Sequence, residues 1–480
     1  MSARLRFPLI QEPRSAARRS LRTGDLLLVG LILTGLAAAW LAEVLPVEQG
    51  VTGLDAAGKF ILIPVKSAVY YAAHAMSIGA LLTAGVIGGL SKRFRNITPE
   101  SRIAFAVLLV TAVTWSLVTY RAEELLSSAL VGATGPFVWI MPVVVFAGAN
   151  RRIWPHLDRF LWMLAYLTAA LALRLLASPY VYYRGFSKYI LYAMLLFWLG
   201  GWTLLTATGL KGLRLLPRLM PYVMMLAMSL CSQSRSWTLL GLLLGATFIY
   251  LRGRERGSLI LAVRSAALLG AGGAVIALGV AIVLPQTLHN SIDGFRNRLK
   301  EDTRSGQYTA FFESVPPSDL LLGRGPKGTW YWRGWGDYQF FDNGFLWTLF
   351  IGGIPTLLGY GTLMFWPAFK ALRAKPHGAD AAALAMVLLE TVSMTGLSTF
   401  TLPTVGLVSY LWAFYAGRCY LVLAESSRIK RFRNRYQSRH SPGQSRNFYS
   451  IRRIDRTSAA IPASVQFTAG GNQTRRSLYE

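Results

Sequence analysis

The stretch LLLVGLILTGLAAAWLAEVL, residues 26–45, carries a single charged side chain, that of Glu43. A helix needs about 20 predominantly apolar residues to cross the hydrocarbon layer of a membrane, and this stretch has that length. Several arginines precede it, but it is too long for the apolar core of a signal peptide and no convincing cleavage site accompanies it. The sequence therefore predicts an uncleaved membrane-spanning helix here.

Further apolar blocks repeat this pattern along the chain. Of its 480 residues, 53% are hydrophobic and 15% are charged, and the apolar residues form blocks near spanning length instead of following amphipathic spacing. The blocks lie at residues 68–90, 103–120, 129–146, 161–177, 190–210, 219–231, 237–250, 259–284, 344–369, 381–400 and 405–423. We therefore predict an all-α, polytopic integral membrane protein with about twelve transmembrane helices and one large external loop.

The basic residues predict the orientation of these helices. Lys and Arg are concentrated before the first block and in alternate loops, and by the positive-inside rule those loops face the cytoplasm. We expect both termini there, and we expect the basic tail to be disordered and to rest on anionic membrane lipid. The predicted parts are an N-terminus (1–25), nine spans (26–284), an external loop (285–343), three spans (344–424) and the tail (425–480).

Composition also excludes several classes of function. The net charge of +28 is explained by helix ends and by the tail, so we do not expect nucleic acid as a partner. Cys231 and Cys419 lie in or beside apolar blocks without CxxC or His–Cys spacing, which is typical of inert packing residues. No DxD motif, histidine cluster or Walker loop is present, so the sequence predicts no metal or nucleotide cofactor.

The external segment LLLGRGPKGTWYWRGWGDYQFFDN, residues 320–343, holds the best candidates for chemistry. Lys and Arg bind anions such as a diphosphate, aromatic faces stack on sugar rings, and carboxylates move protons. Acids and bases are roughly balanced in this loop, so orientation alone does not explain its cations. The cations on this face are Arg296, Arg298, Lys300, Arg304, Arg324, Lys327 and Arg333, with Arg121, Arg184 and Arg235. Their number predicts an anionic ligand.

Each candidate also has a structural interpretation. Arg235, between two short helices, either lines a wet cavity or reaches out to the headgroups. The glycine-rich turn at 323–328 either cradles phosphate oxygens or simply connects two elements. Trp330 and Trp332, with the neighbouring aromatic residues, either stack on sugars or form an interfacial belt.

Asp342 and Asn343 stand just before an apolar helix. At that position an Asp is favoured simply because it caps the helix. At the outer mouth of a cavity, the same carboxylate can accept a proton from a sugar hydroxyl as a general base. The sequence leaves both roles open.

Three motifs resemble the bacterial superfamily of O-antigen polymerases (Wzy-type) and O-antigen ligases. SQSRSWTLLGLLLG, residues 232–245, is similar to the family's Ser-Arg followed by an apolar, Gly-containing helix. RSGQYTAFFESVPPSDLLLGRGPKG, residues 304–328, is similar to its external stretch that runs from an Arg to a Gly-x-Gly turn. FFDNGFLWTLFIGGI, residues 340–354, is similar to its His-Asn or Asp-Asn before a Gly-rich helix. The resemblance covers the C-terminal third to half of the chain.

The resemblance implies a glycosyltransferase on the periplasmic face of the bacterial inner membrane, with an undecaprenyl-diphosphate-linked oligosaccharide as donor. Arg235 and Arg304, with Arg298 and Arg324 as alternatives, would neutralise the diphosphate leaving group. Asp342 would deprotonate the acceptor hydroxyl and Asn343 would hold that carboxylate or the sugar. The substrate-binding set is completed by Lys327, Trp330, Trp332 and Arg333. A growing polysaccharide, a chain-length regulator and a flippase are the further expected partners.

Two departures from the family's pattern bear on the choice between polymerase and ligase. Asp342 stands where the ligases have His, which favours a polymerase of O-antigen or exopolysaccharide. The arginine of the second motif is displaced to Arg304, so the sequence does not decide which loop cation contacts the diphosphate. The alternatives are a ligase, a peptidoglycan polymerase of the shape and division family, and a lipid-linked oligosaccharide flippase or two-repeat carrier.

Overall fold

The computed structural model describes most of the chain between residues 23 and 439. The described ranges are 23–45, 48–54, 60–65, 67–90, 98–119, 137–176, 188–210, 212–232, 234–257, 303–332, 336–338, 343–397 and 406–439, with single positions between them. The chain divides into two compact units, residues 1–425 and residues 426–480. All site residues considered below belong to the first unit.

Eight helices in these ranges have the length and apolar composition to cross a membrane. They are α1 (Thr23–Val44), α2 (Ala68–Leu90), α3 (Pro99–Thr119), α9 (Leu216–Cys231) with η4 (Gly212–Leu215) before it, α10 (Arg235–Arg256), α15 (Gly344–Tyr360) with η5 (Gly361–Phe365) and α16 (Trp366–Leu372), α17 (Gly378–Val392) with η6 (Ser393–Leu397), and α18 (Leu407–Arg439). The chain is therefore a multi-pass helical membrane protein, as predicted. The total of twelve spans stays a prediction.

The remaining helices correspond only in part to the apolar blocks that the sequence predicted as spans. Helices α7 (Trp154–Leu176) and α8 (Lys188–Leu205) correspond to the blocks at 161–177 and 190–210. The end of the block at 129–146 forms three short pieces, α5 (Phe137–Ile140), η3 (Met141–Val143) and α6 (Val144–Gly148). Most of the block at 259–284 lies outside the described residues.

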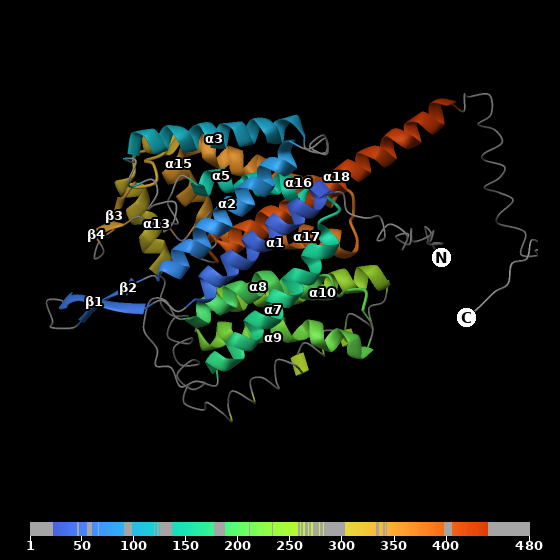
Figure 1. Ribbon diagram of the computed structural model, residues 1–480, viewed down its shortest axis with the longest axis horizontal. Coiled ribbons are helices and arrows are strands. Elements are labelled where there is room, and N and C mark those ends of the chain that lie inside the picture. The colour runs from blue at the N-terminus through green and yellow to red at the C-terminus, as the bar shows by residue number, and fades with distance from the viewer. Residues whose placement is uncertain are drawn as a thin grey trace, which may run out of the picture. The chain divides into compact units, whose positions relative to one another are not determined.

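Two antiparallel hairpins and two short helices lie between the long helices. β1 (Glu48–Leu54) pairs with β2 (Phe60–Val65), in a segment for which the sequence predicted no element. The loop predicted to be external, called the external loop below, contains α13 (Thr303–Ser314), α14 (Pro317–Leu322) and the hairpin of β3 (Trp330–Trp332) with β4 (Gly336–Tyr338). Figure 1 shows α13, β3 and β4 together at one end of the long helices, at the left of the view.

The predicted tail, residues 425–480, was expected to have little structure of its own. Instead, α18 continues as a helix through Arg439. Leu, Ala, Arg and Lys have high helix propensity, and a helix already nucleated by a membrane span can propagate into a basic sequence. The helix thus extends past the predicted boundary at residue 425, and the disorder of the tail stays a prediction.

The described loops with the cationic excess meet at one end of the bundle, and the predicted loop with Lys92, Arg93 and Arg95 lies outside the described residues. The contacts are Arg152 with Asp25 at 2.7 Å, Arg151 with Glu425, Arg254 with the carbonyl of Pro376 at 2.6 Å, Arg256 with the carbonyl of Gly209 at 2.7 Å, and Arg418 with Asp380 at 2.7 Å. This is the grouping of alternate loops that the sequence predicted. The side of the membrane that these loops face stays a prediction.

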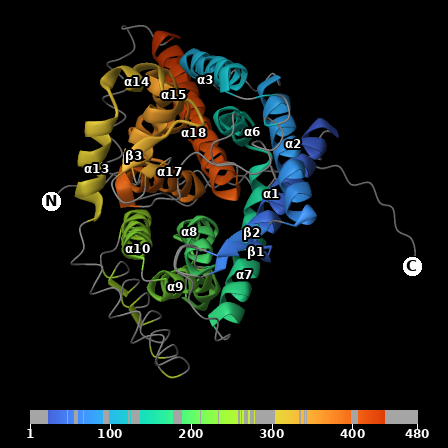
Figure 2. The ribbon, with the colours of Figure 1, turned by 90° about the vertical axis from the view of Figure 1, so that its left-hand side faces the viewer.

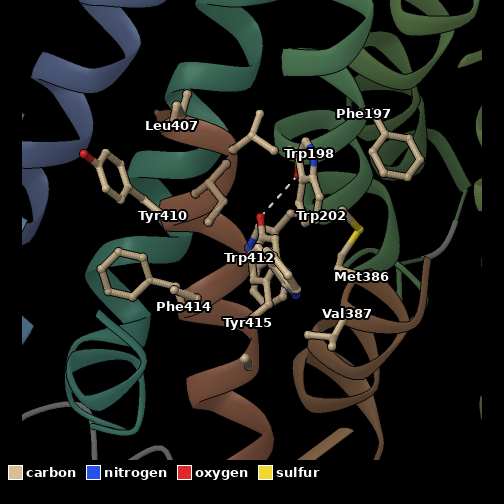
Figure 3. Packing of buried hydrophobic residues seen from close by; sticks show 14 of the residues in the cluster. Phe197, Trp198, Trp202, Met386, Val387, Leu407, Tyr410, Trp412, Phe414 and Tyr415 are labelled. Atoms are coloured by element: carbon tan, nitrogen blue, oxygen red, sulfur yellow. Dashed lines mark hydrogen bonds between the residues drawn. The ribbon is translucent and has the colours of Figure 1, made fainter. Parts of the chain in front are cut away.

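Aromatic side chains fill the centre of the bundle between α8 and α18. The ring of Tyr415 stacks on Trp202 at 4.8 Å and on Trp198 at 5.9 Å between centroids, and its hydroxyl donates to the carbonyl of Trp198 at 3.2 Å (Figure 3). Close backbone contact elsewhere needs glycine: a Cβ on Gly417 would lie 2.7 Å from the Cα of Gly148. Small residues commonly allow membrane helices to approach in this way.

A tyrosine hydroxyl donates a hydrogen bond to a backbone carbonyl near a proline in the α15–α16 segment. Pro367 has no N–H to donate to the carbonyl of Leu363, four residues earlier, and that region is a π-helix. The hydroxyl of Tyr420 donates to this carbonyl at 3.2 Å and lies 2.5 Å from the hydroxyl of Ser101. Ser101 must therefore be the donor in its contact with Tyr420. The hydroxyl ties α3, the α15–α16 segment and α18 together.

Tyr420→Phe is expected to lower the free energy of unfolding by about 1 kcal/mol, because it removes the hydrogen bond to the buried carbonyl of Leu363. Chemical denaturation of the purified protein in detergent micelles measures this loss. The matched control is Tyr250→Phe, at a tyrosine on α10 that is 66% exposed. Equal stability of the two variants would contradict the structural role of the Tyr420 hydroxyl.

Candidate functional site

The site is built on a break in α15, the helix that follows the external loop. Gly353 interrupts the helix with φ 71° and ψ −175°, a backbone conformation that only glycine adopts readily. Pro355, two residues later, has no N–H to offer the carbonyl of Ile351. The break also removes the regular helical partner of the carbonyl of Phe350. Two carbonyls in a membrane helix therefore need donors from elsewhere.

The glycine-rich turn of the external loop supplies those donors. The amide of Arg324 donates to the carbonyl of Phe350 at 2.7 Å, and the amide of Gly325 donates to the carbonyl of Ile351 at 2.8 Å. The backbones approach so closely that a Cβ on Gly323 would lie 2.6 Å from the amide nitrogen of Gly353. Figure 2 shows the result, with α14 and α15 side by side near α3.

These contacts bear on the two roles that the sequence left open for the turn. The amides of Gly323 and Gly328 also donate to backbone carbonyls, those of Asp319 at 2.9 Å and Gly325 at 3.0 Å. Four amides of the turn are thus engaged with the backbone, and they do not form the expected phosphate cradle. The turn instead fixes the external loop to the broken helix.

The side chain of Arg324 is held in place at this junction. Its Nε donates to Asp319 Oδ2 at 2.5 Å and its Nη1 donates to the carbonyl of Thr329 at 2.6 Å, while the guanidinium lies 5.8 Å from the ring centroid of Phe350. Guanidinium has five N–H groups, and its Nη2 has no partner among the described residues. Arg324 is therefore a preorganised cation with donors left for an anion.

Lys327 lies at the edge of the turn and pairs with a residue that follows α3. Its Nζ lies 2.7 Å from Glu124 Oε2, and both side chains are about half exposed. The hydrogen bond from Lys327 lowers the pKa of the Glu124 carboxyl below its ordinary value of 4.5. A lowered carboxyl pKa means that the pair persists as the pH falls to the ordinary value of 4.5 and is lost below it, at the folded-state pKa.

In detergent-solubilised protein, Glu124→Gln is expected to increase the reactivity of Lys327 toward an amine reagent a few-fold at pH 7, because the amine loses its carboxylate partner. Peptide mass spectrometry of the labelled protein measures the rate at this lysine. Lys375, exposed in a separate loop, is the internal control and should not change. An unchanged rate at Lys327 would contradict the pairing.

Most of the predicted aromatic cluster packs on itself. Trp330 is 1% exposed, with ring centroids of Phe311 at 5.4 Å, Phe341 at 5.8 Å and Trp332 at 6.0 Å. Its ring has no face open to a ligand, so sugar stacking by Trp330 is contradicted by its burial. Trp332 is half-buried and keeps some exposed surface. The cluster is a small apolar core that stabilises the external loop.

Asn343 is the N-cap of α15. Its Oδ1 accepts from the amides of Phe345 at 3.0 Å and Leu346 at 3.1 Å, and its Nδ2 donates to the hydroxyl of Tyr308 at 3.1 Å. The cap is thus Asn343, and its amide joins α15 to α13. Arg304 stands on α13 one helical turn before Tyr308, on the same face of the helix.

Arg235 is the first residue of α10, after the N-cap Ser234. At the other end of α10, Arg254 and Glu255 contact the residues that begin α17: Glu255 Oε1 accepts from the amide of Gly378 at 2.7 Å. The two helices are therefore antiparallel, and the Arg235 end lies toward η6, with which α10 is in contact. The start of α15 adjoins η6 as well, because a Cβ on Gly344 would lie 3.0 Å from Met394. The helix starts beside Arg235 and Asn343 thus flank the same short element.

Four of the predicted residues stay untested. Asp342, Arg298 and Arg333 lie outside the described residues, and the side chain of Arg304 is not described. Among described residues, no group of three or more His, Cys, Asp or Glu side chains is placed to hold a metal ion. Sequence reasoning missed Tyr308 and Asp319, because no spacing pattern predicts that a loop tyrosine reaches a helix cap or that an aspartate fixes an arginine.

The geometry brings the turn with Arg324, the start of α15 and the start of α10 to one end of the bundle. Comparison with protein-family models, with curated proteins and with solved structures finds no match to this chain.

Proposed function

We propose that this protein is a membrane glycosyltransferase that polymerises a polysaccharide. In this proposal it transfers undecaprenyl-diphosphate-linked repeat units on the periplasmic face of a bacterial inner membrane. The proposal rests mainly on the proximity of the three motifs in the fold. Residues 304–328 bind residues 340–354 through backbone hydrogen bonds. The helix that begins within residues 232–245 contacts η6, and η6 also adjoins the start of α15. Motifs far apart in sequence that share one end of a bundle fit a single site.

The reaction assigns one role to each group. The acceptor hydroxyl attacks the anomeric carbon of the donor sugar, a new glycosidic C–O bond forms, and the C–O bond to the diphosphate breaks. Asp342 takes the hydroxyl proton, and undecaprenyl diphosphate leaves with the bonding electrons. Arg235, Arg304 and Arg324 stabilise the negative charge that develops on the leaving group. Arg324 is suited to this role because Asp319 and the carbonyl of Thr329 fix its guanidinium while leaving Nη2 open.

The burial of Trp330 changes how the sugar would be held. Trp332 is the aromatic candidate that keeps exposed surface, and Lys327 stands at the margin, already paired with Glu124. The described contacts hold Arg324 in place with a donor open, so the proposal relies on recognition of the diphosphate more than on recognition of one particular sugar.

The test is mass spectrometry of lipid-linked glycans from a strain without this gene, with the two membrane leaflets resolved. Single repeat units stranded on the outer leaflet support a polymerase. Long polymer still attached to undecaprenyl diphosphate would identify a ligase, and units trapped on the inner leaflet a flippase. An unchanged glycan pool would refute all three.

A further inference from the structure

The cap of α15 fixes the orientation of an amide that ordinary geometry leaves ambiguous. The Asn343 side chain has one oxygen, which accepts hydrogen bonds, and one NH₂ group, which donates them. Two backbone amides, those of Phe345 and Leu346, point at one end of this side chain at 3.0 and 3.1 Å. That end must be the oxygen, because an NH₂ group there would face two other donors. The opposite end, which faces Tyr308 at 3.1 Å, is therefore the NH₂ group.

The orientation of Asn343 determines what the Tyr308 hydroxyl does. A phenol hydroxyl can accept hydrogen bonds and can donate one. Because Asn343 donates to it, the Tyr308 oxygen is an acceptor in that contact, and its own proton is left over. No acceptor for this proton occurs among the described residues. Within the described part of the chain, the Tyr308 hydroxyl therefore keeps a proton that it can donate to a ligand.

Packing holds this donor in a defined place. The ring of Tyr308 is half-buried and meets Phe341 edge to face, with 4.9 Å between centroids. Phe341 in turn packs on Phe311 at 4.6 Å, within the apolar core of the external loop. A ring clamped in this way presents its hydroxyl with little loss of side-chain entropy when a ligand binds, which is the advantage of preorganisation.

The surroundings of the hydroxyl select an anion. Arg304 stands one turn away on the same face of α13, and Asp342, the assigned base, is the neighbour of Asn343 in sequence. A neutral O–H donor on a helix face that also carries an arginine position suits an oxygen that carries negative charge, because hydrogen bonds to ionised acceptors are about twice as strong as neutral ones. We propose that the Tyr308 hydroxyl donates its proton to a diphosphate oxygen of the lipid-linked donor. This inference rests on the proposed function and adds a substrate contact to it.

The test measures binding without chemistry. The full-length protein in lipid nanodiscs is titrated with undecaprenyl diphosphate, and Tyr308→Phe is expected to weaken binding about 10- to 100-fold, the usual effect of losing a hydrogen bond to a charged group. Phenylalanine keeps the edge-to-face contact with Phe341. The matched control is Tyr331→Phe, in which an exposed hydroxyl of the same loop is removed, and it should bind as wild type does. Wild-type affinity in Tyr308→Phe would overturn the proposal.

A second variant reverses the hydrogen bond without removing the tyrosine. Asn343→Asp keeps a capping oxygen, but its other oxygen accepts the Tyr308 proton instead of donating to the hydroxyl. We expect the same loss of affinity with an unchanged or higher melting temperature, because a carboxylate is favourable at a helix N-terminus. In the Tyr308→Phe background, the added Asn343→Asp change should cost much less than it does alone. Full additivity of the two losses would overturn the inference, since it would mean that Asn343→Asp acts through its charge alone.

The binding assay also separates a direct contact from an indirect one. If Tyr308 touches the diphosphate, Tyr308→Phe lowers affinity equally in the wild-type and Asp342→Asn backgrounds. If the effect disappears with Asp342→Asn, the hydroxyl acts through that carboxylate and the proposed contact is wrong. Failure of the wild-type protein to bind undecaprenyl diphosphate would refute the proposed function itself. Normal wild-type binding with an unaffected Tyr308→Phe would refute only this inference.

Discussion

Replacing Asp342 by alanine is expected to lower chain extension by about 10²- to 10⁴-fold, the usual contribution of a general base, while the amount of folded protein stays near wild type. The measurement is incorporation of lipid-linked repeat units by membranes that contain equal amounts of each variant. Stability should survive because Asn343, not Asp342, supplies the oxygen that caps α15. An aspartate needed only for capping would instead cost about 1 kcal/mol of stability and little activity.

The matched control for this substitution lies in the same loop. Asp337→Ala removes an exposed carboxylate from β4 and changes the charge of the loop by the same amount. Activity in this control should stay close to wild type, so a general electrostatic effect of the loop is separated from proton transfer. Asp342→Asn should be as inactive as Asp342→Ala, because the amide cannot accept the proton. An Asp342→Asn variant with full activity would remove this residue from the mechanism.

The long helices were the most predictable part of the fold. The block at residues 68–90 became α2 with the same bounds, because apolar length alone defines a membrane span when no charge interrupts it. The block at 344–369 was found as well, but its interior was not. A break at Gly353 and a π-helix at Gly361–Phe365 depend on which donors reach the freed carbonyls, and those donors lie elsewhere in the chain.

The site was predictable as a place but not as a set of contacts. Sequence located the turn with Arg324 and the helix that follows the loop, and the turn does bind that helix, at Phe350 and Ile351. It left the turn as either a phosphate cradle or a plain connection, and Trp330 as either a platform for a sugar or part of an interfacial belt. In the structure the amides bind the broken helix and Trp330 is buried. Glycine-rich turns and aromatic clusters serve both purposes, and only the three-dimensional neighbours decide between them. The partners Asp319 and Tyr308 became visible only once the chain was folded.

The junction between the turn and the broken helix is the feature on which the site geometry depends most. If the turn separates from α15, the carbonyls of Phe350 and Ile351 lose their donors and Arg324 moves away from Phe350. A substitution at the junction should therefore affect stability and activity together. A substitution elsewhere in the loop should affect neither strongly.

Gly323→Ala is expected to lower the free energy of unfolding by about 3 kcal/mol or more and to reduce chain extension at least tenfold. Gly323 has φ 85°, and an added Cβ would lie 2.6 Å from the backbone nitrogen of Gly353, which cannot move without disturbing the break. Gly336→Ala is the matched control, because Gly336 has φ 68° but no atom lies within 4 Å of its added Cβ. That variant carries the backbone strain alone, about 1–2 kcal/mol. Thermal unfolding in detergent and trypsin cleavage after Arg324 measure the difference; equal losses in the two variants would mean that strain, not docking on α15, makes Gly323 necessary.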